Sequence, residues 1–65
     1  MEIKSVFELS LMEPEAVFKY AKQLELQLKL LGWYKKNEAG TLTESQQETF
    51  NRIMELFRWI RINCG

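Results

Sequence analysis

Glutamates are the candidates for acid–base chemistry in this sequence of 65 residues, in which all nine acidic residues are glutamate and histidine is absent. A pair of buried carboxyl groups can act as general acid and general base. Every glutamate, however, falls outside the apolar stripes of the predicted helices, so each side chain is expected to lie in water. There is also no histidine to act as a base near neutral pH and no glycine-rich phosphate loop. The sequence therefore predicts a protein that is not an enzyme.

Metal-ligating side chains are equally scarce. Zinc sites draw on cysteine and histidine, and Cys64 is the single cysteine. A calcium or magnesium site needs clustered oxygen ligands in a loop, but the one polar loop, residues 35–40, carries one carboxylate beside two lysines. We therefore expect no metal and no other cofactor.

The lone thiol also indicates where the protein works. One cysteine excludes an internal disulfide and fits a reducing compartment better than a secreted scaffold. The first residues are followed by no signal-peptide core, and no apolar run approaches the roughly 18 residues of a membrane span. We expect a cytoplasmic protein with no membrane partner.

Arginine and tryptophan side chains raise the question of nucleic-acid binding, because together they can stack on bases. The candidates Arg52, Arg58 and Arg61 spread over half the circumference of their helix at about 100° per residue, with Glu48 and Glu55 among them. Nine basic residues balance the nine glutamates, so there is no basic excess. Nucleic acid is not the expected partner, and it is kept as an alternative because a dimer would bring together the arginines of two copies.

The strongest helix pattern covers residues 14–36. Pro14 suits the first helical position, where a missing N–H costs nothing. Apolar residues then recur at helical spacing: Val17, Ala21, Leu24, Leu28 and Leu31. The alternating run 24–30 also resembles a strand, but it contains good helix formers and no β-branched residue. Gly32 either caps this helix or lies inside it at a cost of about 1 kcal/mol. We prefer the second interpretation, because it leaves a short connection to the next helix.

A second helix is predicted over residues 44–62. Thr43 and Gln46 have capping-box form, and an apolar stripe follows: Phe50, Ile53, Met54, Phe57 and Ile60. Residues 5–12 are more ambiguous, because they match both a short capped helix and an alternating strand. A lone strand has no partner in this chain, so we expect a short helix packed over the two long ones.

A second set of apolar residues is left over when the two long helices cover each other. It provides the candidate partner or dimer surface: Leu26, Leu30, Trp33, Leu56 and Trp59. Phe18 lies at the edge of the first stripe. One interpretation covers this set with the N-terminal residues Val6, Phe7 and Leu11. A second buries it in a homodimer, and a third makes it a docking surface for a different protein, with the two tryptophans as anchors.

These patterns predict an all-α single domain, residues 1–65. Two helices joined by a short loop must lie antiparallel, so we expect a two-helix hairpin with a short N-terminal helical segment. A chain this short buries only about 60% of its unfolded surface, so pairing into a four-helix bundle as a homodimer is the expected stabiliser. The predicted function is a small regulatory protein that binds another protein through exposed apolar and aromatic residues. The alternatives are a nucleic-acid-binding regulator that uses the three arginines and a structural subunit of a larger assembly.

Overall fold

Four helices, and no strand, make up the ordered elements of the computed structural model, which describes residues 2–64. They are α1 (Val6–Ser10), α2 (Pro14–Leu31), α3 (Trp33–Ala39) and α4 (Glu44–Asn63). The all-α class expected from the sequence is confirmed. The N-terminal segment is helical rather than extended, and the Ser5 hydroxyl accepts a hydrogen bond from the backbone N–H of Glu8 at 3.2 Å.

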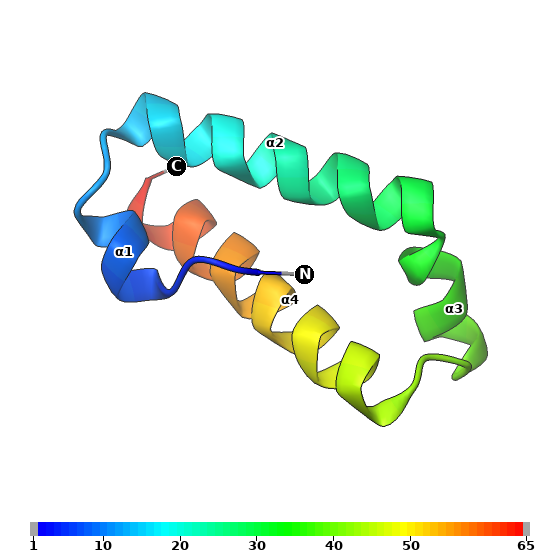
Figure 1. Cartoon of the computed structure of the whole chain (residues 1–65). Helices are drawn as coiled ribbons and strands as arrows, with labels where there is room; N and C mark the ends of the chain where they lie inside the picture. The colour runs from blue at the N-terminus through cyan, green and yellow to red at the C-terminus, as the bar shows by residue number, and fades with distance from the viewer. Residues whose placement is uncertain (1, 65) are drawn as a thin grey trace.

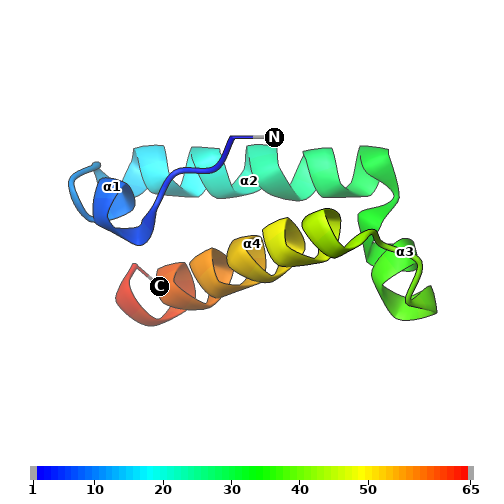
Figure 2. The same cartoon turned by 60° about the horizontal axis from the view of Figure 1, so that its bottom comes forward.

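The two long helices, α2 and α4, run side by side in opposite directions (Figures 1 and 2). Helix α3 turns the chain at one end of the pair, and α1 lies at the other end (Figure 2). The residues before α1 return along one flank of both long helices. There the backbone N–H of Lys4 donates to the Tyr20 hydroxyl of α2 at 2.8 Å. Residues 3–6 also line a shallow pocket together with Thr49 and Leu56 of α4, so one side of the α2–α4 seam is covered.

Helix α4 begins at a complete capping box. The Thr43 hydroxyl accepts a hydrogen bond from the backbone N–H of Gln46, and the Gln46 side chain accepts one from the backbone N–H of Thr43, both at 3.1 Å. Two backbone donors that lack partners inside the helix are thereby satisfied. The start of α4 is therefore determined locally, by two residues three positions apart.

The helix predicted over residues 14–36 is divided at Gly32, which corrects the preferred interpretation of the sequence. Gly32 has φ 72° and ψ 21°, in the left-handed region, and its N–H donates to the carbonyl of Lys29 at 3.1 Å. A left-handed residue ends a helix while satisfying its last carbonyls, and only glycine adopts this conformation without strain. The chain resumes as α3 at Trp33 in a new direction.

Replacing Gly32 by alanine is expected to lower the free energy of unfolding by about 1 kcal/mol, because alanine is strained at positive φ. An added Cβ would have no atom within 4 Å, so the backbone alone sets the effect. Urea denaturation followed by far-UV circular dichroism measures it. The sign is decisive, since alanine inside a continuous helix would instead stabilise the protein by a similar amount. A Gly32→Ala variant more stable than the unaltered chain would contradict a helix break at Gly32.

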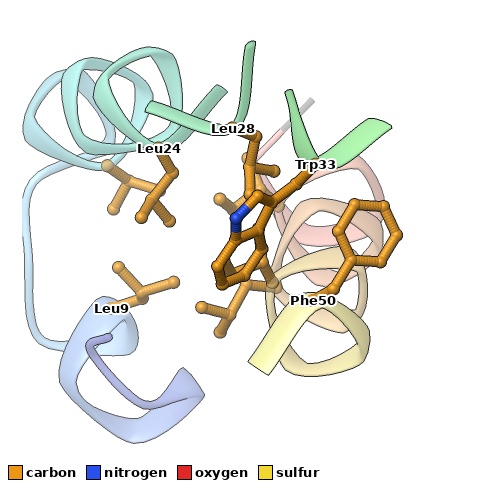
Figure 3. Close-up of a cluster of buried hydrophobic side chains, with 9 residues drawn as sticks. Leu9, Leu24, Leu28, Trp33 and Phe50 are labelled. Atoms are coloured by element: carbon orange, nitrogen blue, oxygen red, sulfur yellow. The ribbon is translucent and has the colours of Figure 1, made fainter. Parts of the chain in front are cut away.

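The core contains one residue from α1, three from α2, one from α3 and four from α4 (Figure 3). Its members are Leu9, Val17, Leu24, Leu28, Trp33, Phe50, Ile53, Leu56 and Ile60. Most of the two predicted stripes is buried here, with four exceptions, of which Ala21 on α2 is half-buried. Leu31 is 49% exposed at the end of α2, and Met54 and Phe57 are only half-buried. Helix α4 is turned toward Leu56 because it packs against both α2 and the N-terminal residues.

The N-terminal segment covers the long helices through a different residue from those expected. Leu9 is buried and faces the core (Figure 3), whereas Val6, Phe7 and Leu11 remain exposed. A helix as short as α1 can turn only one narrow side toward the core, and Leu9 lies on that side. The prediction that Val6, Phe7 and Leu11 cover the long helices is therefore wrong. Leu9 covers them instead, with Ile3 and Met12 packed at the edge of the core.

Candidate protein-interaction surface

The five residues predicted to meet a partner do not share one surface of the molecule. They are Leu26, Leu30, Trp33, Leu56 and Trp59. Two of them are buried in the core, two are exposed on α2, and the fifth is half-buried on α4. No continuous contact surface is formed by the set, so its members have to be considered separately.

Trp33 and Leu56 belong to the core of the single chain, which corrects the expectation that they are left outside it. Trp33 is the first residue of α3, and the turn at Gly32 directs its ring into the cluster that Leu28 and Phe50 also enter (Figure 3). It is 8% exposed. Leu56 is covered from the other flank by residues 3–6. Neither side chain is accessible to a partner while the chain keeps this fold.

Leu26 and Leu30 are the exposed members of the set. Their side chains are 58% and 78% exposed, and they alternate along α2 with Leu24 and Leu28, which are buried. At about 100° per residue, a two-residue step turns a side chain by about 200°, so Leu26 and Leu30 lie on the outward side of α2. We call these two residues the outer α2 surface. Trp59 lies apart from them on α4, half-buried at the edge of the core.

An open groove lies along the flank of the α2–α4 seam that the N-terminal residues do not cover. It has a volume of about 570 Å³. Its lining comes from α2, α3 and α4: Phe18, Ala21, Lys22, Glu25, Tyr34, Phe57 and Arg61. We call this the seam groove. None of these residues lines the pocket beneath residues 3–6, because the two sites lie on opposite flanks of the helix pair.

The floor of the seam groove is apolar and aromatic. Phe57 is half-buried and packs against the core, whereas Phe18 is 42% exposed at the rim. Tyr34 packs edge-to-face against Phe50, with 5.9 Å between ring centroids and 83° between planes, a preferred geometry for aromatic pairs. The rings of Tyr34 and Phe57 are therefore held in place before any partner binds.

Tyr34 also gives the groove a hydrogen-bonding group. Burial raises the pKa of the Tyr34 hydroxyl above its ordinary value; the negative charge of Glu25 adds to the rise and Lys29 opposes it. A phenol is already protonated near neutral pH at its ordinary pKa, and this rise in pKa leaves the Tyr34 hydroxyl in that form. Its O–H can donate a hydrogen bond to a group that enters the groove.

The charged residues at the rim of the seam groove differ in how they are paired. Glu25 lies 3.3 Å from the ammonium group of Lys29, one turn further along α2. Neither Lys22 nor Arg61 has a carboxylate within 4.0 Å among residues 2–64. Lys22 belongs to α2 and Arg61 to α4, so each side of the groove carries one positive charge that has no carboxylate partner among the described residues.

The three arginines considered for nucleic-acid binding remain distributed around α4. Arg61 lines the seam groove, whereas Arg52 lines the pocket on the opposite flank. Arg52 also lies 3.6 Å from Glu48, one turn away on the same helix. A continuous phosphate-binding stripe requires basic residues on one face, and this arrangement does not favour one on a single copy.

Within the part of the chain that the structure describes, no three His, Cys, Asp or Glu residues come together as a metal site. Over the same residues, no helix has both the length and the apolar character needed to cross a membrane.

Cys64 is half-buried beside the core and ends α4, where its N–H donates to the carbonyl of Ile60 at 2.7 Å.

The sequence-based candidates omitted most of the seam groove. The stripe pattern predicts that Phe57 faces inward, and it places Tyr34 in a helix that does not continue through Gly32. The available signal was the width of the apolar stripe on α4, where Met54 and Phe57 lie to one side of Ile53 and Leu56 to the other. So wide a stripe cannot be covered by α2 alone.

Comparisons of this chain with protein-family models, with curated proteins and with solved structures find no match. Its function must therefore be inferred from its own surfaces, of which the seam groove and the outer α2 surface are the strongest candidates.

Proposed function

We propose that this chain is a small, non-enzymatic interaction protein that regulates another protein by binding it through apolar and aromatic residues. The observation that supports the proposal is the seam groove, an aromatic-lined opening beside the core of a very small protein. Binding sites are typically concave and largely apolar, with a few polar groups that orient the ligand. The seam groove has this composition, with Tyr34 as its hydrogen-bond donor.

The proposed antiparallel hairpin explains how so short a chain presents such a groove. Two adjacent helices leave a furrow on each side of their line of contact. Here the N-terminal residues lie along one furrow and leave a shallow pocket against α4, whereas no segment lies along the other among the described residues. A third helical element from a partner would complete the packing on the open side. The cytoplasm remains the proposed compartment, on the grounds of the single cysteine.

The proposed function can be tested by affinity capture from a cytoplasmic extract with the full chain as bait. Phe18→Glu adds a charge at the exposed rim of the groove without altering the buried core. We expect the unaltered chain and a Gln23→Glu control to capture a protein that the Phe18→Glu variant does not capture. The same captured proteins with all three baits would contradict the proposal. Circular dichroism verifies that each bait is folded.

Self-association into a four-helix bundle is a second part of the proposal, and the exposure of Leu26 and Leu30 favours it. Packing of α2 against α2 of a second copy would bury both leucines in a symmetric contact, the commonest arrangement in oligomers. The two copies together would supply four long helices. This contact leaves the seam groove open, because the outer α2 surface faces away from α4.

Light scattering over a concentration series under reducing conditions measures this association. The unaltered chain is expected to reach twice 7.8 kDa, and Leu26→Glu/Leu30→Glu is expected to remain a folded monomer, since it places charges in the contact. Arg58→Glu makes the same change in net charge at an exposed position of α4, away from the contact, and is expected to remain dimeric. A monomeric unaltered chain at every concentration would refute the dimer.

A further inference from the structure

We infer that the seam groove accepts an amphipathic helix whose apolar ridge is flanked on both sides by carboxylates. The inference rests on the proposed function and specifies the chemistry of the partner. Three features of the groove support it: its aromatic floor, its position between two helices and the positive charge on each rim.

The charges select an acidic partner. Lys22 and Arg61 lie on opposite walls of the groove, and neither has a carboxylate within 4.0 Å in the described part of the chain. The one acidic residue in the lining, Glu25, is already paired with Lys29 at 3.3 Å. Complementary charge favours the correct partner and speeds its encounter. One carboxylate on each edge of the incoming segment would meet Lys22 on one side and Arg61 on the other.

The surroundings of the groove select a helix over an extended segment. An extended strand would need backbone partners for its own N–H and C=O groups, whereas the helices that form the walls have already paired theirs. An amphipathic helix satisfies its own backbone and presents apolar residues at positions i, i+3, i+4 and i+7. Such a ridge fits between α2 and α4, over Ala21 and Phe57.

A second copy of this chain is a poor occupant of the groove. In a twofold pair through this face, the two copies would bring two Lys22 and two Arg61 side chains into one contact. Only Glu25 would oppose them, and it is held by Lys29. Like charges brought together in a contact disfavour it. Self-association is therefore assigned to the outer α2 surface, and the groove to a different protein.

The inference can be tested by selecting, from a displayed library of helical peptides, those that bind the full chain. The ridge positions vary among Leu, Ile, Met and Phe, and one position on each flank varies among Glu, Gln and Lys. The unaltered chain is expected to enrich Glu at both flanks. The double variant Lys22→Glu/Arg61→Glu is expected to enrich Lys instead, and each selected peptide should bind the non-cognate protein about tenfold more weakly. Both altered residues are exposed, so the fold is retained.

A matched variant, Lys19→Glu/Lys36→Glu, makes the same change in net charge outside the groove and is expected to keep the preference for Glu. The inference would be overturned if the unaltered chain and the groove variant enriched peptides with the same flanking residue, or if neither enriched any peptide. Association with anionic phospholipid vesicles in place of peptides would overturn it too. The charge preference could be absent while the Phe18→Glu variant still fails to capture a protein that the unaltered chain captures. In that case the inference of an acidic helical partner is wrong and the proposed function stands.

Discussion

Replacing Leu28 by alanine is expected to leave most of the protein unfolded at room temperature. Leu28 is fully buried in the last turn of α2, where residues from α3 and α4 surround it (Figure 3). Truncating a buried leucine costs about 2–5 kcal/mol, because transfer energy is lost and a cavity remains. A single core in a chain this short rarely supplies more than about 3–5 kcal/mol in total. Urea denaturation followed by far-UV circular dichroism measures the loss.

Leu30→Ala is the matched control, because it is the same substitution two residues further along the same helix. Leu30 is 78% exposed, and a change at such a site is expected to stay within about 0.5 kcal/mol. The comparison is made below the concentration at which copies associate. Equal losses in the two variants would show that α2 does not face the core through Leu28.

Trp33→Ala is the second substitution with a large expected effect, about 3–5 kcal/mol of unfolding free energy. The indole is buried where α2, α3 and α4 meet (Figure 3), so its removal opens the largest cavity that one substitution in this core can make. The thermal midpoint by circular dichroism, and the loss of the signal from a buried tryptophan in the fluorescence spectrum, are the two measurements.

This experiment also separates two roles for Trp33. If Trp33 were an exposed anchor for a partner, as the sequence predicts, alanine would leave stability within about 0.5 kcal/mol and reduce binding alone. Trp59→Ala provides the comparison, because Trp59 is only half-buried and its truncation is expected to cost less. A Trp33→Ala variant as stable as the unaltered chain would contradict the core assignment.

The helical class and several helix boundaries could be predicted from the sequence because both depend on residues a few positions apart. The spacing of Val17, Leu24 and Leu28 identifies one side of a helix whatever it packs against. Thr43 and Gln46 form their capping box within a single turn of chain. These features are encoded locally, so no knowledge of the tertiary structure was needed.

Gly32 marks the limit of local reasoning. A glycine inside a helix and a glycine that ends one have the same neighbours in sequence, and the two conformations differ by only about 1 kcal/mol. Packing decides between them, since the break allows Trp33 to enter the core. The short connection that made a continuous helix attractive was less important than burial of a large aromatic ring.

The seam groove was less predictable still. Phe18, Tyr34 and Phe57 come from three helices, and nothing in the spacing of one helix shows which flank of its stripe another segment will cover. Leu9 and residues 3–6 cover the flank that contains Leu56, so Leu56 is buried and Phe57 is left beside an opening. That outcome depends on contacts between residues about 50 positions apart.

By itself, then, the sequence determined that this protein is helical and where its strongest helix signals lie, because propensity and periodicity act over short distances. Only the tertiary structure decided which apolar residues remain outside the core. Burial of an apolar side chain depends on the segment that packs over it, and α1, Gly32 and Trp33 together placed that cover on one flank of the α2–α4 pair and left the other open.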